Sequence, residues 1–341
     1  MRRGHQNQCE SRAFPDVTSP LPDPDLTAII PMCNAAATVG KVVDSFLQVP
    51  GKQVEVIVID DGSTDDSLEV VRGLAREEIR LITLGSNHGA GYARNVGFEQ
   101  ARGRYSIFFD ADDELDADVV ARALDALDST DTDVAMMPYT YRRGWTTDYT
   151  GMNSFDQVVW ESYLGDSARR LVRLSEVPRL LGFSNYPWNK LLRTERFRQT
   201  ALRFSETHVH NDILGHWMTL LGARTILLFN ESVCTHIVGD GGGNLSHRMG
   251  RERLALFDAL DETYDELQSR PELRNRYSHH YWDFVLRSSG WALDRLAPEV
   301  VDDARQRLQQ HLLRINLADF MRIRERRDPS LADRIVRRSL V

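Results

Sequence analysis

Residues 54–66 read VEVIVIDDGSTDD, and this stretch decides the fold because a mostly apolar run stops abruptly at a pair of carboxylates. The short, largely β-branched run Val54–Ile59 is typical of a strand that is buried on both faces. A helical pattern follows it at 63–76. A buried strand that leads into a helix is the repeating unit of a parallel sheet covered by helices.

The same alternation continues on both sides of this stretch. We expect strands at 26–31, 79–84, 105–109 and 134–137, and helices at 38–49, 91–102 and 117–127. Farther along, the pattern predicts helices at 155–174 and 211–222 and strands at 225–229 and 233–238. The fold class is therefore α/β with a mostly parallel, Rossmann-like sheet, and ligands of such sheets bind beyond the carboxyl ends of the strands.

The two ends of the chain have different patterns. Residues 1–25 are rich in proline and polar residues and lack an apolar period, which predicts a disordered leader. Residues 246–341 read as helices only. Between them, residues 239–244 include a run of glycines that is typical of a flexible loop or lid.

Composition excludes several classes of protein. The chain has 341 residues and a formal net charge of −8, which argues against a general nucleic-acid binder. The cysteines, Cys9, Cys33 and Cys234, are too scattered for a disulfide framework or a zinc site. No secretory signal and no apolar run of ~18 residues is present, so we expect a cytoplasmic protein without a membrane span.

Carboxylates follow the strand at 54–59. Asp60 and Asp61 stand at the carboxyl edge of the sheet, where a carboxylate can accept hydrogen bonds from a base or ribose. The alternative is structural, because Ser63 and Asp66 have the spacing of a helix capping box. A cap explains the residues from Ser63 onward but leaves Asp60 and Asp61 unexplained.

A glycine-rich turn follows the next strand. Residues 87–95 read NHGAGYARN, and glycines before a helix let its backbone N–H groups approach a phosphate. Arg94 adds a fixed positive charge. Most such turns are only turns, and His88 is expected to be a surface loop residue.

Residues 108–113, FFDADD, carry the sharpest signal. Asp110 and Asp112 leave a buried strand one residue apart, so both can point into the same space. Carboxylates together with substrate phosphates are the ligands that Mg²⁺ and Mn²⁺ prefer. The alternative is a solvated acidic turn, which accounts for Asp113 and Glu114.

Residues 206–212, ETHVHND, run into the helix expected at 211–222. Asp212 could simply cap that helix. His208 and His210 alternate along the chain and could share a strand face as metal ligands, although no third ligand stands near them.

Taken together, these segments resemble the family 2 glycosyltransferases of GT-A fold. The matching text is 28–31 (AIIP) with Asn34, then 58–65 (VIDDGSTD), 93–97 (ARNVG), 101–103 (ARG) and 109–113 (FDADD). A weaker match continues through 188–191 (WNKL) and 211–212 (ND) to about residue 245. The resemblance implies a catalytic domain over 26–245, with a donor-binding half at 26–120 and an acceptor half at 121–245.

The resemblance also implies donor-binding roles. Asp61, with Asp60, would contact the base, typically uracil, and Pro31 and Asn34 would line the pocket for base and ribose. Arg94 would stand near the base and the diphosphate.

Further roles concern the chemistry. Asp110 would face the ribose or donor sugar, Asp112 would hold Mn²⁺ or Mg²⁺, and Asp212 would be the catalytic base. Two positions depart from the usual family pattern. Cys33 replaces an aromatic residue that stacks on the nucleotide, and Asn211 replaces an acid before the catalytic base.

The expected function is inverting transfer of a sugar from a nucleotide-sugar donor, typically a UDP-sugar, to a hydroxyl of a glycan, lipid or protein. Displacing the diphosphate needs a cation to stabilise the leaving group, a base for the hydroxyl, and alignment of both substrates. Two alternatives are a non-catalytic sugar-nucleotide or glycan-binding module and a sugar-phosphate nucleotidyltransferase. The latter usually has a basic glycine-rich loop after the first strand, where residues 32–37 here read MCNAAA.

For a few residues the sequence allows either a functional or a structural role. Trp188 and the loop 239–244 are candidates for acceptor contact, with a core role as the alternative for Trp188. His236 is a second candidate metal ligand, with an ordinary strand position as its alternative. The arginine-rich stretch 320–338 predicts a basic amphipathic helix that contacts a membrane surface or packs within an oligomer.

Overall fold

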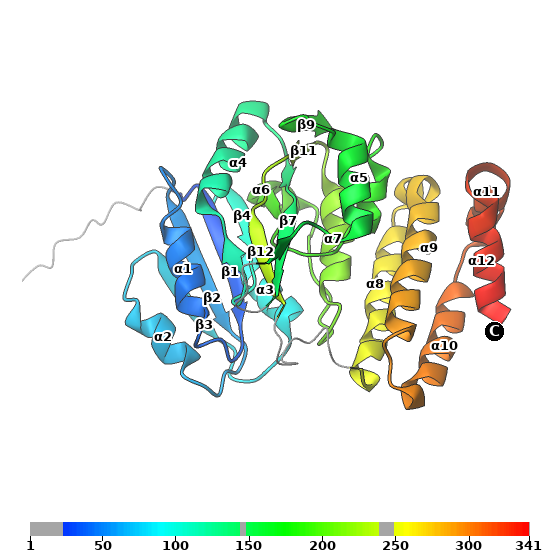
Figure 1. Ribbon diagram of the computed structural model, residues 1–341, viewed down its shortest axis with the longest axis horizontal. Helices are drawn as coiled ribbons and strands as arrows, with labels where there is room; N and C mark the ends of the chain where they lie inside the picture. The colour runs from blue at the N-terminus through cyan, green and yellow to red at the C-terminus, as the bar shows by residue number, and fades with distance from the viewer. Residues whose placement is uncertain (1–22, 144–147, 239–248, 341) are drawn as a thin grey trace, which may run out of the picture.

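The computed structural model describes residues 23–143, 148–238 and 249–340. Its centre is an eight-stranded sheet in the order β3-β2-β1-β4-β10-β6-β11-β9 (Figure 1). Its strands are β1 (Leu26–Met32), β2 (Val54–Asp60), β3 (Ile79–Thr83), β4 (Tyr105–Phe108), β6 (Val134–Met136), β9 (Arg169–Val172), β10 (Lys190–Arg193) and β11 (Ile226–Phe229). Only β10 and β9 run against their neighbours, so the predicted α/β class with a mostly parallel sheet is confirmed.

A smaller sheet continues from the carboxyl edge of the large one, in the order β5-β12-β7-β8. Its strands are β5 (Glu114–Leu115), β7 (Tyr139–Arg143), β8 (Tyr149–Thr150) and β12 (Cys234–Val238). Because β12 pairs with both β5 and β7, the segment after residue 233 returns to the turn at 110–113.

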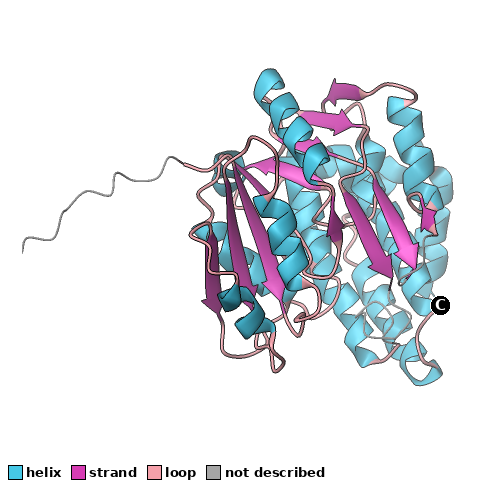
Figure 2. Cartoon of the chain, turned by 60° about the vertical axis from the view of Figure 1, so that its left-hand side comes forward, coloured by secondary structure: helices cyan, strands magenta, loops and turns pink. Residues whose placement is uncertain are grey.

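Helices cover both faces of the large sheet (Figure 2). Ala28 and Ile30 of β1 belong to the same core cluster as α1 (Val39–Leu47), α2 (Ser67–Gly73) and α4 (Ala117–Thr130), whereas Ile29 faces the opposite side. That side is covered by α3 (Ala90–Gln100), α6 (Thr194–Gln199) and α7 (Asp212–Gly222). Both alternating sets of side chains are thus buried, which explains the continuous apolar strands.

Two sequence expectations differ from the structure. The helix expected at 155–174 is wrong in its second half, because α5 (Ser154–Leu164) ends at Gly165, whose φ is +54°, and β9 then pairs with β11. The helix expected from residue 63 begins only at Ser67. The preceding turn is held by side chains, since Asp60 accepts from the Ser63 N–H at 3.2 Å and Asp65 accepts from the Ser67 N–H at 3.0 Å.

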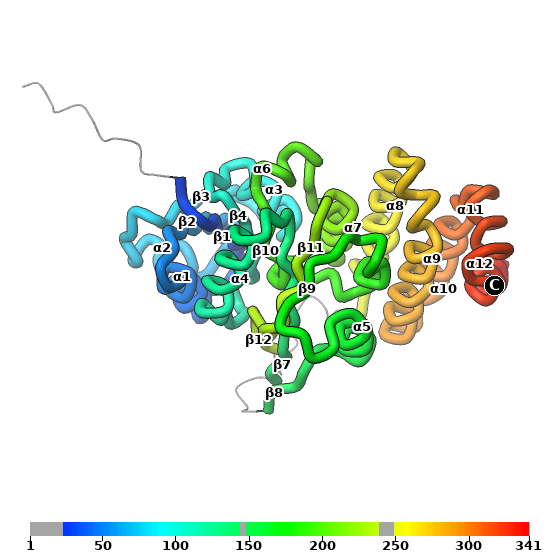
Figure 3. The backbone as a smooth tube through the Cα atoms, turned by 90° about the horizontal axis from the view of Figure 1, so that it is seen from above, coloured from blue at the N-terminus to red at the C-terminus, as the bar shows by residue number. Residues whose placement is uncertain are grey.

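The predicted helical C-terminal region is confirmed. It comprises α8 (Ala255–Gln268), α9 (Pro271–Leu293), α10 (Pro298–Leu312), α11 (Leu317–Arg322) and α12 (Pro329–Leu340). Figure 3 shows α8 beside α7, with the later helices stacked progressively farther from the sheet. The stretch 320–338 is two helices rather than one, because a π-helical turn at Ile323–Arg327 and then Pro329 interrupt it.

Within the described ranges, every helix is too short or too polar to cross a lipid bilayer. The expected leader falls mainly on residues 1–22, and the loop 239–244 also lies outside the described residues.

Candidate active site

A cavity of about 760 Å³ opens beyond the carboxyl end of β1. Its wall includes residues from seven separate parts of the chain: Pro31, Asn34, Arg94, Asp110, Asp112, Tyr186, His208, His210, Asn211, Asp212, His236 and Arg253. Seven of the site residues predicted from the sequence therefore share one cavity. Asp60 and Asp61 lie beneath it, with 3% of each residue exposed.

Asp61 connects two loops of the donor half. Its carboxylate accepts from the backbone N–H groups of His88 at 2.6 Å and Gly89 at 2.8 Å. Because both carboxylate oxygens are engaged, Asp61 fixes the glycine-rich turn against the end of β2. The structural part of its role is thus visible directly, and contact with a base stays a prediction.

Asn34 occupies a left-handed backbone conformation, with φ of +53°. Its side-chain oxygen accepts from the Thr64 N–H at 2.8 Å, and its own N–H donates to the Ser63 hydroxyl at 3.0 Å. Cys33 is exposed next to it and accepts a hydrogen bond from the Asn87 amide at 3.3 Å. The rim of this part of the cavity is therefore held in shape by its own side chains.

Arg94 joins the two halves of the site. It is 4% exposed, and its guanidinium donates to Asp110 Oδ1 at 2.6 Å and to Asn211 Oδ1 at 2.7 Å. Close packing of α3 against the loop before α7 makes this possible, since a Cβ on Gly91 would lie 1.9 Å from the carbonyl oxygen of Ser205. The bridge sets the position of the loop at 110–112 relative to the start of α7.

Asp112 reaches into the cavity beside other carboxylates. Its side chain is exposed within the cavity. Desolvation by the surrounding cavity wall, together with the negative charges of Asp113 and Asp110, raises its pKa to about 7. Such crowding of carboxylates is the electrostatic condition under which a divalent cation binds. Within the described part of the chain, no three or more His, Cys, Asp or Glu side chains form a metal-binding group. The residues fit a cation held by Asp112 together with oxygens of a substrate diphosphate and water, rather than a cage made by protein alone.

Asp113 and His236 form a buried pair next to Asp112. His236 Nδ1 lies 2.8 Å from Asp113 Oδ1, which also accepts from the Ile237 N–H at 3.0 Å. Burial lowers the pKa of His236, but the hydrogen bond to Asp113 and the nearby carboxylates outweigh it and leave the pKa raised. A carboxylate on one ring nitrogen is the usual orientation of a metal-binding histidine, so His236 stays a candidate ligand.

Asp212 is the first residue of α7 and faces the cavity. Burial raises its pKa, against the opposing charges of Arg94 and Lys190. A carboxylate with a raised pKa that faces a substrate-sized cavity is suited to accept a proton. The loop before it is constrained as well, because His210 has φ of +60°, a conformation that is unusual for histidine.

His208 and His210 do not form a metal site with other ligands in the described residues. His210 has its pKa lowered to about 4 by burial and by Arg253, and its ring meets the Trp291 ring edge-on. His208 lies beside Gly89 at the opposite end of the loop.

Trp188 is fully buried, and Tyr186 takes the position on the cavity wall. The two rings stack with centroids 4.5 Å apart and an interplanar angle of 13°. From the sequence, Trp188 is the candidate for acceptor contact, and Tyr186 is not predicted. Nor does the sequence predict the pairing of Asp113 or the burial of Lys190, although a lysine between Trp188 and the apolar residues of β10 was a visible signal.

Comparison with known proteins supplies a further set of findings. The sequence model of the family described as "Glycosyl transferase family 2" matches residues 27–198.

Glycosyltransferase GlyA of Streptococcus pneumoniae is 27% identical over 254 residues, which cover 71% of this chain and 34% of GlyA. The uncharacterized glycosyltransferase YibD of Escherichia coli is 26% identical over 273 residues, which cover 74% of this chain and 76% of YibD. The succinoglycan biosynthesis protein ExoO of Rhizobium meliloti is 35% identical over 113 residues, 33% of this chain and 32% of ExoO. The chain thus spans about a third of the length of ExoO and GlyA.

Solved structures share the fold. Residues 1–349 of TarS from S. aureus superpose with a TM-score of 0.69 at 17% identity, covering 93% of this chain and 88% of that one. TarS has also been solved with UDP and with UDP-GlcNAc. The mannosyltransferase PcManGT from Pyrobaculum calidifontis, solved with GDP-Man and Mn²⁺, gives a TM-score of 0.55 at 15% identity and covers 97% of this chain and 90% of its own.

Proposed function

The chain belongs to glycosyltransferase family 2, with the GT-A fold, and from that premise we propose that it transfers a sugar from a UDP-sugar to a hydroxyl group with inversion at the anomeric carbon. The observation that carries this proposal is the meeting of Asp112, Arg94 and Asp212 in one cavity. These side chains supply a carboxylate for a cation, a fixed positive charge and a base for the hydroxyl. A glycan, lipid or protein would carry the acceptor hydroxyl.

The donor would occupy the half of the cavity formed by Pro31, Asn34 and Arg94. The left-handed turn at Asn34 and the tie from Asp61 to the glycine-rich turn keep this pocket open before a ligand arrives. A binding site formed in advance needs less ordering when the ligand binds. Structural neighbours solved with UDP and UDP-GlcNAc support a uridine nucleotide as the donor class.

Asp112 would hold Mn²⁺ or Mg²⁺, with His236 as the second candidate. When bound, the cation supplies Lewis-acid stabilisation of charge on the diphosphate leaving group. The raised pKa of Asp112 and the crowding of carboxylates around it support this assignment. The Mn²⁺ in the PcManGT structure supports it by fold analogy alone.

Asp212 would take the proton from the acceptor hydroxyl. Its position at the start of α7 is set by the bond from Arg94 to the neighbouring Asn211. Direct displacement by the activated hydroxyl needs no covalent enzyme intermediate, and a single displacement inverts the anomeric carbon. Alignment of hydroxyl, sugar and diphosphate in one cavity would supply further catalysis.

The test is a thermal-shift screen of UDP-glucose, UDP-galactose, UDP-N-acetylglucosamine and GDP-mannose, each with MnCl₂. A true donor binds the folded state only and raises the melting temperature with concentration. Donors that stabilise the protein are then assayed for release of the nucleoside diphosphate. The proposal is refuted if no nucleotide sugar shifts the melting temperature and none is hydrolysed or transferred.

A further inference from the structure

Lys190 is an amine buried inside the protein, at the start of β10, with 2% of the residue exposed. Its Nζ donates to the Tyr186 carbonyl oxygen at 2.6 Å and to Asn189 Oδ1 at 2.7 Å. Both partners are neutral, and among the described residues Lys190 forms no ion pair within salt-bridge distance. Burying an ammonium group without a direct counter-ion lowers the stability of the folded state, which suggests that Lys190 has a role other than stabilising the fold.

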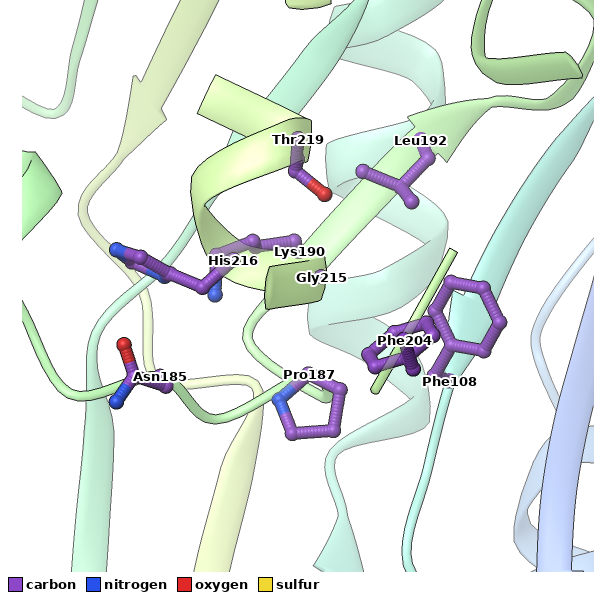
Figure 4. Close-up of a pocket in the computed structure, with 9 residues that line it drawn as sticks. All are labelled: Phe108, Asn185, Pro187, Lys190, Leu192, Phe204, Gly215, His216 and Thr219. Atoms are coloured by element: carbon purple, nitrogen blue, oxygen red, sulfur yellow. The ribbon is translucent and has the colours of Figure 1, made fainter. Parts of the chain in front are cut away.

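Lys190 lies in a small cavity between β10 and α7. Figure 4 shows it beside His216 and Asn185, with Phe108, Phe204 and Leu192 across the cavity. His216 lies 3.0 Å from the Leu180 carbonyl oxygen through Nε2, and burial, followed by Lys190 itself, keeps its pKa well below the ordinary value. His216 is therefore neutral and adds no charge to this cavity.

Two carboxylates act electrostatically on the charge of Lys190, Asp212 of α7 and Asp156 of α5. Asp212 lies one helical turn before His216, which lines the same small cavity as Lys190. Burial lowers the pKa of Lys190 to about 7, and both carboxylates oppose that shift. Asp156 already accepts from the Tyr139 hydroxyl at 2.6 Å and from the Ser184 N–H at 3.1 Å. Asp212 faces the active-site cavity instead, and the charge of Lys190 acts on it from the protein interior.

Lys190 also forms hydrogen bonds to the segment that contributes Tyr186 to the cavity wall. Tyr186 lines the active-site cavity, and the ammonium group of Lys190 holds both the carbonyl of Tyr186 and the side chain of Asn189. The buried ammonium group thus forms hydrogen bonds to the segment 186–189, and its charge also stabilises the ionised form of Asp212.

We propose that Lys190 is a positioning residue for sugar transfer, which anchors the segment 186–189 and favours the ionised form of Asp212. This inference rests on the proposed function, because it takes Asp212 to be the base. A base must be ionised to accept a proton. A nearby ammonium group, which is charged at the acidic pH values where Asp212 titrates, therefore extends activity to lower pH.

The test compares Lys190→Met and Lys190→Gln with the matched control Thr219→Val. Met removes charge and hydrogen bonds, and Gln keeps a donor without the charge. Thr219 lies in the same small cavity and on the same helix as Asp212, so its replacement perturbs the packing but not the charge. The rate of UDP-sugar hydrolysis with MnCl₂ is measured against pH, with the donor found in the thermal-shift screen.

Both Lys190 variants should move the acidic limb of the profile upward by about one pH unit, because loss of a nearby positive charge favours the neutral carboxyl. The control should leave the limb in place. Amide hydrogen exchange over 184–190 should quicken in Lys190→Met by about tenfold, the effect of losing a hydrogen bond to a charged group. If Lys190→Met does not fold, the acidic limb of the pH–rate profile of Lys190→Gln tests the proposal.

The variant Asp212→Asn distinguishes failure of the proposed base from failure of the proposed role of Lys190. If Asp212→Asn is inactive but neither Lys190 variant moves the limb, the inference on Lys190 alone is overturned. If Asp212→Asn hydrolyses the donor as fast as the native protein, the base assignment fails and the inference falls with it. Unchanged hydrogen exchange over 184–190 in Lys190→Met would overturn the anchoring role.

Discussion

Replacing Arg94 by lysine keeps the positive charge of the bridge but removes its fork. In the native protein the guanidinium donates to Asp110 at 2.6 Å and to Asn211 at 2.7 Å, with 4% of the residue exposed. Lysine is shorter and carries a compact ammonium group, so it can reach one of these acceptors but not both. The buried oxygen of Asn211 would then lose its donor.

The expected loss is one hydrogen bond to a charged group, about 1.5–3 kcal/mol. Since both bonds exist in the folded protein before any ligand binds, the free energy of unfolding should fall by that amount. The bridge also positions the start of α7 relative to the loop at 110–112. If the same loss appears in the transition state, the transfer rate falls about 10- to 150-fold.

Urea unfolding and steady-state sugar transfer measure the two effects. The matched control is Arg122→Lys, since Arg122 forms an exposed ion pair with Glu231 at the surface. That change should leave the free energy of unfolding near its native value and leave transfer intact, because an exposed ion pair contributes little to stability. If Arg94→Lys behaves like this control in both assays, the bridge does not hold the site together.

Three further changes test other parts of the structure. Asp212→Asn should cut turnover by about 10²–10⁴-fold while donor binding in calorimetry is kept; full activity would mean that the base is elsewhere. Because burial raises the pKa of Asp212 above 3.8, native activity should be lost as the pH falls through that raised pKa, and an acidic limb at the ordinary value would contradict this. Asp112→Ala should abolish the Mn²⁺-dependent part of donor binding, and calorimetry showing equal binding would remove its metal role. Gly97→Ala should lower the free energy of unfolding by about 1–3 kcal/mol, since its Cβ would lie 2.5 Å from Ile29 and 2.6 Å from Ile59; a native unfolding midpoint would refute the close packing of α3.

The order of strands and helices up to residue 137 could be predicted because it depends on local patterns. Apolar β-branched runs such as 54–59 are strands wherever both faces are covered. The error at 155–174 has a local cause too, since Gly165 takes a positive φ that ends α5. The apolar residues beyond it belong to β9, whose pairing with β11 no local pattern shows.

The candidate site could be predicted as a set of residues but not as a set of contacts. Asp110, Asp112 and Asp212 stand out by their place at strand and helix ends, and the structure brings all of them to one cavity. Trp188 was the aromatic candidate for acceptor contact, yet it is fully buried and stacks on Tyr186, which lines the cavity. Which aromatic residue faces the cavity depends on the path of the segment before β10, where the Tyr186 carbonyl accepts a hydrogen bond from Lys190.

From the sequence by itself came the class of fold, the family, and the carboxylates at the sheet edge, because burial and turn chemistry act between neighbours along the chain. Tertiary structure alone decided that Arg94 meets Asn211, 117 positions away, and that Lys190 is buried with its amine bonded to the Tyr186 carbonyl oxygen. Such contacts arise when separate helices and strands pack at a particular distance and angle. Short-range sequence patterns predict which face of a helix or strand is buried, but not which residues of other elements pack against that face.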